Sequence, residues 1–279
     1  MQHINDNKLF SKVIDEYDAL LKEYKTIIID GFNRQDFIEY NEILFSAHSC
    51  GIEGNSFSVD DTRELKEKGL GMIPYGKTLF EAFEILDHFS ACEFLFNRRK
   101  EPLSEKLLKE THRVLTEHTL PFRLKDAIPG EYTDRDMGAG DTIFGDHTKL
   151  IPQVPVLLSN VQNEIEKQQI HPIILAARFH LIFEYLHPFR DGNGRIGRLF
   201  SNFILSKMDN PMVIITRERK EDYLAALKAF KTERCDQFII DFFFDTAIER
   251  MKNEIKEKKN LTQNFLTGVE ITDNIKKSM

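Results

Sequence analysis

The amino-acid sequence predicts an all-α protein that carries one small β-hairpin. Apolar side chains recur at helical spacing along most of the 279 residues. The sequence shows no alternation of strands with helices, so it does not indicate a parallel sheet. One segment differs, because residues 129–152 are rich in Gly, Asp and Thr and contain short β-type patches. We expect that segment to be a loop that carries the hairpin.

The remaining elements follow from the same periodicity, taken in chain order. We expect helices at residues 7–24, 35–50, 60–68, 78–96, 104–117, 151–168, 172–186, 195–207, 218–231 and 235–258. The tail after Lys256 is polar and rich in lysine, and we expect it to fray. No repeat or low-complexity linker marks a domain boundary.

The helix at residues 172–186 has prolines at both ends. Pro172 suits its first turn, where the missing N–H would have no partner in any case. Pro188 ends the helix, because proline disfavours helical geometry at the residue before it. His187 is therefore expected just past a helix C-terminus, on a rigid exit. The next helix, at 195–207, presents Arg195 and Arg198 on its polar face, pointing back toward the glycine loop before it.

Composition limits the classes of function. The formal net charge is −7, which makes a general nucleic-acid-binding face improbable. Three widely separated Cys fit a reducing compartment better than a disulfide framework. The polar N-terminus lacks an apolar signal core, and no run approaches the roughly 20 apolar residues that cross a bilayer. We expect a cytoplasmic protein that binds neither nucleic acid nor membranes.

Residues 187–198 concentrate the chemistry. The Gly-Asn-Gly loop at 192–194 leads into a helix N-terminus, where inward backbone N–H groups bind anions such as a di- or triphosphate. Arg195 and Arg198 can each bind the outer phosphate oxygens through paired hydrogen bonds from the guanidinium group. Asp191 is a hard oxygen ligand suited to Mg²⁺. His187 can accept a proton near neutral pH. Each feature alone is usually structural, but their combination favours a site for a metal-bound phosphate.

This stretch matches the Fic (fido) family signature, His-Pro-Phe-x-(Asp/Glu)-Gly-Asn-Gly-Arg-x-x-Arg, at every defined position. The resemblance extends to Ala176 and His180 before it and to Asn202 after it, and it covers about residues 104–244. It implies a mainly helical Fic fold. It also implies a protein adenylyltransferase (AMPylator), a nucleotidyltransferase that moves AMP from ATP to a Ser, Thr or Tyr hydroxyl of a target protein and releases pyrophosphate.

The resemblance also assigns roles. His187 would deprotonate the target hydroxyl, and Asp191 would hold Mg²⁺ between the α- and β-phosphates. Backbone N–H groups of Gly192, Asn193 and Gly194 would cradle the phosphates, with the Asn193 side chain on the α-phosphate. Arg195 would bind the β-phosphate region and Arg198 the γ-phosphate. The loop from about Thr142 to Lys149, with Ile143 and Phe144, would be a flap that captures an extended target segment by strand pairing.

Two residues are candidates for adenine or ribose contact. They are Asn202 and Tyr223, although an ordinary packed tyrosine explains Tyr223 equally well. The base selectivity, the target and the type of hydroxyl cannot be read from the sequence. The sequence also leaves open whether the protein forms a homodimer and whether it modifies itself.

Residues 49–55 suggest a built-in brake. Glu53 lies at the C-terminal end of the helix expected from residue 35, where an acidic residue opposes the helix dipole. Ser49, Glu53 and Gly54 resemble the Fic inhibitory motif (Ser/Thr)-x-x-x-Glu-(Gly/Asn). The resemblance implies the class with an N-terminal inhibitory helix, in which Glu53 pairs with Arg198 in the place of the γ-phosphate. Some family members with this glutamate also remove AMP, and the sequence leaves that activity open.

These observations divide the chain. We expect an N-terminal helical region at 1–103 with the inhibitory helix at about 35–54, a Fic catalytic core at 104–244, and a C-terminal helix and tail at 245–279.

Four alternatives stand beside this hypothesis. Residues 71–78 fit the P-loop pattern Gly-x-x-x-x-Gly-Lys-(Ser/Thr), although charged helical residues precede them instead of a strand. His180, His187 and Asp191 could form a transition-metal site. A Fic-fold transferase could move UMP, phosphate or phosphocholine, although the intact Gly194 favours AMP. A non-enzymatic interaction protein with the same fold is the fourth.

Overall fold

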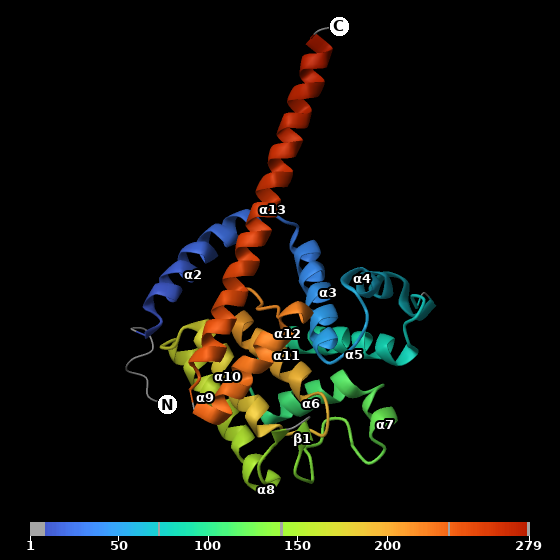
Figure 1. The fold of residues 1–279 in the computed structure, drawn as a ribbon, viewed down its shortest axis with the longest axis vertical. Coiled ribbons are helices and arrows are strands. Elements are labelled where there is room, and N and C mark those ends of the chain that lie inside the picture. Colours follow the sequence, from blue (N-terminus) through green and yellow to red (C-terminus); the bar gives the residue numbers. More distant parts are fainter. Residues whose placement is uncertain (1–8, 72, 140–141, 234, 278–279) are drawn as a thin grey trace.

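The computed structural model describes residues 9–71, 73–139, 142–233 and 235–277, and it is built almost wholly of helices (Figure 1). Residues 139, 142, 143, 231–233 and 261–277 are described by their backbone alone. The prediction of an all-α fold is confirmed. The longer helices are α2 (Ser11–Tyr24), α3 (Arg34–Ile52), α4 (Val59–Lys68), α5 (Leu79–Phe96), α6 (Glu105–Thr116), α9 (Gln153–Lys167), α10 (Pro172–Leu186), α11 (Asn193–Lys207), α12 (Lys220–Glu233) and α13 (Gln237–Lys277).

α10 and α11 form the centre of the fold. α10 begins with Pro172, and the ring of His171 accepts a hydrogen bond from the N–H of Ile173 at 3.3 Å. α9, α12 and α13 pack around α10, while α3, α5 and α6 pack against α11. The two central helices approach closely at Gly197, where an added Cβ would lie 2.8 Å from Nδ1 of His180. This packing fixes the loop between them.

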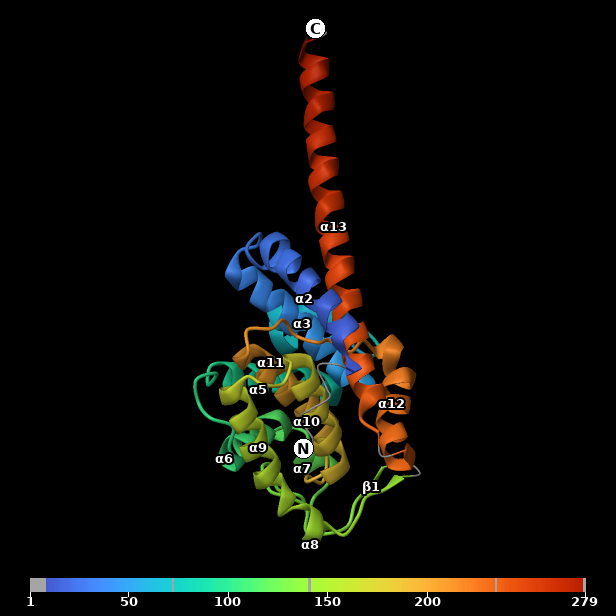
Figure 2. The same ribbon diagram turned by 90° about the vertical axis from the view of Figure 1, so that its left-hand side faces the viewer.

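α13 is the longest helix and runs along one side of the molecule. It packs against α2, α10 and α12, and its far end projects well beyond the body (Figures 1 and 2). The Tyr24 hydroxyl donates to Oε2 of Glu254 at 2.5 Å, which ties the end of α2 to this helix. The expectation that the helix ends at 258 is wrong, because α13 continues to Lys277. The second half of α13 lacks proline, so no residue there forces the helix to end. Fraying of the tail after Lys256 stays a prediction.

A short π-helix at Lys25–Ile29 links α2 to the next part of the chain. α3, α4 and α5 then enclose a second, smaller apolar cluster, made of Ile43, Cys50, Phe57, Leu65, Ala82, Ile85 and Phe89. α4 and α5 both begin with capping boxes. In α5, Oγ1 of Thr78 accepts from the N–H of Glu81 at 3.2 Å, and the Glu81 carboxylate accepts from the N–H of Thr78 at 2.9 Å.

Residues 71–78, which match the P-loop pattern, lead into this capping box. The described residues before it form α4 and a 3₁₀ turn at Gly69–Gly71, not a buried strand. Nζ of Lys77 donates to the Ser56 carbonyl and lies 3.5 Å from Oδ2 of Asp61. Lys77 and Thr78 thus have local partners, and the strand that a phosphate-binding P-loop requires is absent from residues 59–71.

The segment at 129–152 contains the one strand pair among the described residues. β1 (Gly138–Ala139) pairs with β2 (Thr142–Ile143) in antiparallel register, Gly138 opposite Ile143 and Ala139 opposite Thr142. Two short helices that the sequence analysis did not anticipate flank it, α7 (Leu120–Arg123) and α8 (His147–Leu150). Asp146 caps α8 by accepting from the N–H of Thr148 at 3.0 Å, so a single Asx cap is enough to start this turn.

The main apolar core draws on every part of the chain. It includes Tyr24 and Phe45 from the first hundred residues, Phe183 and Phe203 from the central helices, and Met251 from α13. The boundaries at 103 and 244 stay predictions. In the described part of the chain, no helix combines the length and the apolarity that crossing a bilayer requires.

Candidate functional site

The loop between α10 and α11 holds a histidine and a helix N-terminus a few residues apart. His187 caps α10 in the left-handed region, with φ 44° and ψ 57°, and its N–H donates to the Phe183 carbonyl at 2.9 Å. Gly192 starts α11 with φ 78°. A left-handed conformation is unfavourable for a residue with a side chain, so the surroundings must hold it. The backbone of this loop therefore fixes the imidazole relative to the tip of α11.

Phe189 anchors the loop in the core. It is fully buried, and its ring stacks on that of His112 with centroids 3.7 Å apart. The Asn193 side chain clasps the same residue: its Oδ1 accepts from the Phe189 N–H at 2.9 Å, and its Nδ2 donates to the Phe189 carbonyl at 2.8 Å. The side chain of Asn193 is thus occupied within the loop, whereas the sequence analysis assigned it to the α-phosphate. Its backbone N–H lies in the first turn of α11, where N–H groups lack intrahelical acceptors.

His112 of α6 holds the loop between α10 and α11 through hydrogen bonds. Its Nδ1 accepts from the Gly130 N–H at 2.9 Å, so the proton sits on Nε2, which donates to the Asp191 carbonyl at 2.9 Å. Burial lowers the pKa of His112 to about 4, and the hydrogen bond to Asp191 opposes this only in part. A neutral histidine with both nitrogens bonded fixes the backbone of Asp191. No local motif in the sequence marks this residue.

Glu53 and Arg198 form an ion pair, as expected from the residues of the inhibitory motif. Nη2 of Arg198 donates to Oε1 of Glu53 at 2.7 Å and to the Ser49 carbonyl at 2.8 Å, and its Nε donates to Oγ of Ser49 at 3.1 Å. Burial would raise the pKa of Glu53, but Arg198 outweighs it and the pKa is lowered. The Glu53 side chain is 39% exposed, so this ionised carboxylate is held by α11 and still reachable from solvent.

The same carboxylate covers the start of α11. A Cβ added to Gly194 would lie 2.3 Å from Oε1 of Glu53 and 3.0 Å from Nη1 of Arg198. Glu53 therefore sits against the backbone of the helix tip, where the electrostatics favour an anion. A carboxylate and a phosphate oxygen would compete for this place.

Asp191 is surrounded by donors. Its Oδ1 accepts from the Gly192 N–H at 2.7 Å, and its Oδ2 accepts from Nη1 of Arg123 at 2.9 Å. Burial would raise the pKa of Asp191, but Arg195 and Arg123 outweigh it and the pKa is lowered. An ionised, partly exposed carboxylate is a fitting ligand for a hard divalent cation that bridges phosphates.

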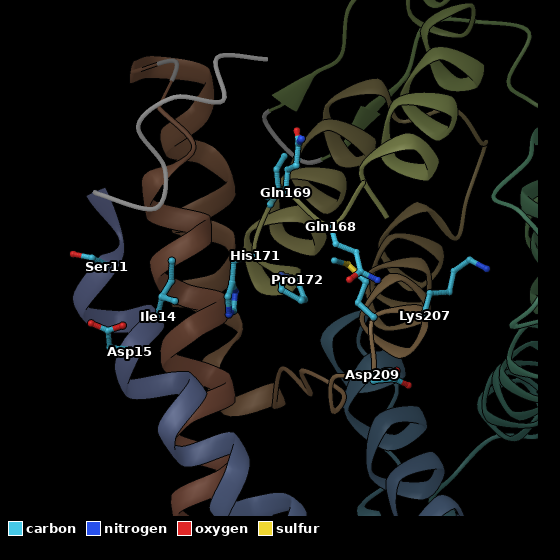
Figure 3. A pocket seen from close by; sticks show the side chains of 11 residues that line it. Ser11, Ile14, Asp15, Gln168, Gln169, His171, Pro172, Lys207 and Asp209 are labelled. Atoms are coloured by element: carbon cyan, nitrogen blue, oxygen red, sulfur yellow. The ribbon is translucent and has the colours of Figure 1, made fainter. Parts of the chain in front are cut away.

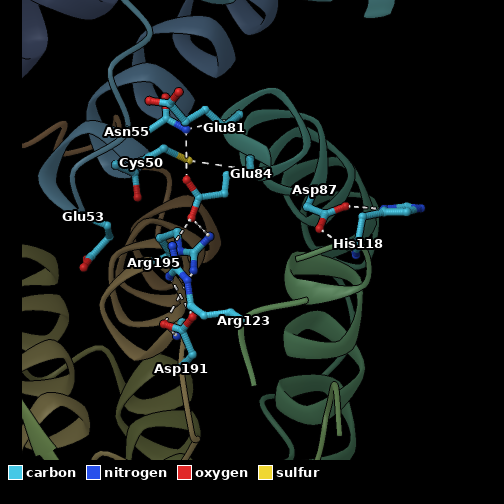
Figure 4. A network of polar contacts seen from close by, with 12 residues as sticks. Cys50, Glu53, Asn55, Glu81, Glu84, Asp87, His118, Arg123, Asp191 and Arg195 are labelled. Atoms are coloured by element: carbon cyan, nitrogen blue, oxygen red, sulfur yellow. Dashed lines mark hydrogen bonds and ion pairs between the residues drawn. The ribbon is translucent and has the colours of Figure 1, made fainter. Parts of the chain in front are cut away.

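Arg195 points away from solvent toward α5. Its side chain is 2% exposed, and its Nη1 lies 3.5 Å from Oε1 of Glu84 (Figure 4). The same Glu84 oxygen accepts from Nη2 of Arg123 at 3.2 Å, while Oε2 accepts from Nδ2 of Asn55 at 3.1 Å. Glu84 thus joins two arginines of the site to the end of residues 49–55, called the inhibitory segment here after the motif that they resemble. The sequence analysis missed Glu84 and Arg123; a buried acid within an apolar helix was the one available signal for Glu84.

The two candidates for base contact have other partners. Nη1 of Arg198 donates to the Tyr223 hydroxyl at 3.4 Å, and this hydroxyl lies 2.7 Å from Nε2 of His180. Burial raises the pKa of Tyr223 and lowers that of His180 to about 3, so both are neutral. Asn202 bonds the backbone of Val213, accepting from its N–H at 2.8 Å and donating to its carbonyl at 3.1 Å. In this structure Tyr223 supports Arg198, and Asn202 holds the chain after α11.

Of the three expected flap residues, Phe144 reaches the site. Its ring stacks on the imidazole of His187 with centroids 3.9 Å apart and an interplanar angle of 13°. The side chains of Thr142 and Ile143 lie outside the described residues. The N–H of Phe144 donates to the Met137 carbonyl at 2.9 Å, which continues the strand pairing.

Other candidate sites lie elsewhere or do not form. Among the described residues, His180, His187 and Asp191 do not come close enough together to hold a metal ion. Asp136, Asp146 and His147, near the strand pair, have ligand atoms within 4.8 Å of one another. A pocket of about 580 Å³ lies between α2, the start of α10 and the end of α11 (Figure 3). It is lined by residues such as Asp15, His171 and Lys207 and contains none of residues 187–198.

The comparisons with known proteins identify this loop. Residues 102–205 match the Fic/DOC family. The chain contains a Fic/DOC family domain. It is similar to the protein adenylyltransferase Fic of Culex quinquefasciatus, with 28% identity over 234 residues that cover 80% of this chain and 43% of that protein. It is 31% identical to the Drosophila melanogaster protein of the same name over 186 residues, or 65% of this chain and 36% of that one. This chain therefore spans less than half of these relatives.

Solved structures share the fold. A Fic domain containing signaling protein from Bacteroides thetaiotaomicron superposes with a TM-score of 0.75 at 23% identity, over 88% of this chain and 97% of that one. Fic-1 from C. elegans superposes with a TM-score of 0.73 at 22% identity, over 91% of this chain and 74% of that one. At these identities the superpositions support the arrangement of helices rather than any particular activity.

Proposed function

We propose that this Fic protein is a protein adenylyltransferase that transfers AMP from ATP to a Ser, Thr or Tyr hydroxyl of a protein and releases pyrophosphate. One observation carries the proposal: left-handed caps at His187 and Gly192 hold an imidazole beside the anion-binding tip of α11. Asp191 and Arg198 flank that tip, and both carry the charge that a metal-bound triphosphate needs. The name protein adenylyltransferase Fic of the relatives supports the same chemistry.

The reaction divides among residues of this loop. His187 accepts the proton of the target hydroxyl, and the hydroxyl oxygen bonds to the α-phosphorus. The bond from that phosphorus to the bridging oxygen breaks, and its electron pair leaves with pyrophosphate. Backbone N–H groups at the start of α11 stabilise the charge on the phosphate oxygens. Holding the hydroxyl, base and phosphorus together removes much of the entropic barrier.

Asp191 fits a divalent cation. Its carboxylate is ionised, one face is reachable from solvent, and its neighbours are the phosphate-binding groups. Mg²⁺ held there would neutralise charge on the phosphates as the pyrophosphate leaves. Arg195 and Arg198 would act on the outer phosphates, although in this structure both are paired with carboxylates. The nucleotide must therefore displace Glu53 from Arg198.

We extend the proposal to autoinhibition by Glu53, as in the class with an N-terminal inhibitory helix. The supporting observations are the 2.7 Å pair with Arg198 and the closeness of the carboxylate to Gly194. ATP then binds in a non-productive pose while the pair lasts. Removal of AMP, modification of the chain itself, homodimerisation and capture of the target by residues 142–144 stay predictions, as does a cytoplasmic location. Asn202 and Tyr223 would contact the base or ribose only after a rearrangement, since both are bonded elsewhere here.

The experiment uses the Glu53→Gly variant with a cell lysate and ATP labelled on the α-phosphate, and then on the γ-phosphate. We expect strong protein labelling from the α position alone, at least tenfold above wild type, because the γ-phosphate gains Arg198 (a tenfold change is about 1.4 kcal/mol). The double variant Glu53→Gly with His187→Ala is the control and should not label. Labelling from the γ position alone would instead show a kinase, and equal labelling by wild type and Glu53→Gly would refute the brake.

A further inference from the structure

A buried carboxyl group lies behind the histidine of the site, and the proposed reaction does not yet use it. Glu184 belongs to the last turn of α10, and its side chain is 16% exposed. Its Oε1 has no hydrogen-bond partner among the described residues. Burying a carboxyl group without full hydrogen bonding is unfavourable, so such a group in a close-packed helix needs an explanation.

The geometry connects this carboxyl group to His187. Oε2 of Glu184 lies 3.9 Å from Nδ1 of His187, one helical turn along the chain. The left-handed conformation of His187 ends the helix at this turn. Phe144 stacks on one face of the ring. Nδ1 therefore lies on the side of this carboxyl group, and we assign Nε2 to the target hydroxyl.

The remaining surroundings of Glu184 set its charge. The titratable and charged groups that face it come from four helices. They are Arg198 of α11, Glu53 at the end of α3, Tyr223 of α12, and His187 and the neutral His180 of its own helix. Burial raises its pKa to about 7; Arg198 opposes this rise and Glu53 adds to it. Removal of Glu53 from Arg198 would therefore favour the ionised carboxylate, in the state that the proposed reaction requires.

We propose that Glu184 is a positioning residue that holds the His187 imidazole with Nδ1 inward and stabilises the imidazolium formed when Nε2 takes the hydroxyl proton. This inference rests on the proposed function, because it assigns a role within that reaction. The carboxylate gains or loses no covalent bond. The hydroxyl proton goes to Nε2, the hydroxyl oxygen bonds to the α-phosphorus, and the electron pair of the broken bond leaves with pyrophosphate. The positive charge on the ring is then compensated at short range.

The test replaces Glu184 by Gln in the Glu53→Gly background. We expect kcat for AMP transfer to fall by roughly 10- to 100-fold, part of the roughly 100- to 10,000-fold that a general base contributes, while KM for ATP stays within a factor of two or so. The acid limb of the kcat profile should move to lower pH, because an imidazolium without a nearby carboxylate loses its proton more easily. Glu164→Gln is the matched control, since it removes a similarly buried carboxyl group from α9, outside the site.

A second measurement needs no nucleotide. The titration of His187, followed by NMR of histidine-labelled protein and assigned with His187→Ala, should have a midpoint lower by roughly one pH unit in Glu184→Gln. Glu184→Gln should also unfold at or above the parental temperature at pH 8, because the folded parent must then carry a buried charge. An unchanged His187 midpoint together with an unchanged kcat would overturn the positioning role. If Glu53→Gly transfers no AMP but the midpoint still moves, the proposed function fails and the positioning role stands.

Discussion

At the scale of single residues, the candidate site sets three guanidinium groups against three carboxylates. The pairs are Arg198 with Glu53, Arg195 with Glu84, and Arg123 with both Glu84 and Asp191. Each guanidinium thus ends on a carboxylate in this structure. The proposed triphosphate and its cation would have to replace some of these partners, so occupancy of the site would be a competition between internal and external anions.

Arg123 should compete with magnesium for Asp191. Its Nη1 donates to Oδ2 of Asp191 at 2.9 Å, and it is 42% exposed, so it can move aside. In Arg123→Gln we expect the Mg²⁺ concentration that half-saturates ADP binding to fall by roughly three- to tenfold, equivalent to about 1 kcal/mol for a partly exposed pair. Fluorescent ADP titrated against Mg²⁺ measures this.

Arg190→Gln is the matched control for this titration. Arg190 lies next to Asp191 in the chain, but its partner is Asp126, 3.3 Å away. Its loss should leave the Mg²⁺ requirement unchanged. If Arg123→Gln needs more Mg²⁺ than wild type, Arg123 is a ligand of the nucleotide and not a rival of the metal.

The sequence predicted residues 187–198 as the candidate site, because the types and spacing of these residues within one short stretch indicate their chemistry. Arg123 and Glu84 carry no such signal, since they meet Asp191 and Arg195 across long stretches of chain. Asn193 shows what packing adds: the loop uses its amide to hold Phe189, and a contact of the same side chain with the α-phosphate stays a prediction. Local pattern therefore identified which groups gather here, and packing decided which of them are already paired.

At the scale of helices, the contact between α10 and α11 depends on Gly197. An alanine there would place its Cβ 2.8 Å from Nδ1 of His180 and 3.0 Å from Oε1 of Glu184. His180 is buried and bonded to Tyr223, so it cannot move easily. Alanine would gain about 1 kcal/mol of helix propensity, but overpacking typically costs about 1–3 kcal/mol. We expect Gly197→Ala to lower the free energy of unfolding by up to roughly 2 kcal/mol, measured by urea titration.

Gly71→Ala is the control, because no atom beyond its chain neighbours lies within 4 Å of the added Cβ. Its free energy of unfolding should stay within about 0.5 kcal/mol of wild type. A Gly197→Ala protein as stable as Gly71→Ala would show that the two helices can separate slightly at no expense.

Helix boundaries show what periodicity can and cannot predict. Pro172 and Pro188 limit α10 from within the sequence, and the predicted range 172–186 is confirmed. α13 has no such signal at its end, and its predicted end at 258 fell about nineteen residues short of Lys277. α7 and α8 are single turns, too short for a period to be visible. Boundaries set by proline were predictable, and those set by propensity or by one cap were not.

At the scale of the whole molecule, the first hundred residues are joined to the central helices at the inhibitory segment. Asn55 bonds Glu84 on one side, and Arg217, at the start of the 3₁₀ turn before α12, holds the other. Nη2 of Arg217 donates to the carbonyl of Phe57 at 2.5 Å and to that of Asn55 at 3.3 Å. The guanidinium passes over Gly51, where a Cβ would lie 2.6 Å from it. The position of Glu53 thus depends on contacts several residues away.

Arg217→Ala should therefore weaken the brake without touching Glu53 or Arg198. Loss of charge-assisted hydrogen bonds, worth about 1.5–3 kcal/mol each when buried and less when partly exposed, should shift the segment toward its released state. We expect basal AMP transfer to rise by up to roughly tenfold, less than in Glu53→Gly. The measurement is labelling from ATP carrying the label on its α-phosphate.

A double-mutant cycle decides whether Arg217 acts through Glu53. In the Glu53→Gly background the brake is already absent, so adding Arg217→Ala should raise transfer no further. Arg219→Ala is the matched control on the same turn, because Arg219 donates to Oγ1 of Thr246 in α13 at 2.9 Å and leaves the inhibitory segment untouched. An equal rise in Arg219→Ala, or a further rise in the double variant, would mean that α12 and its turn affect the site by another route than the position of Glu53.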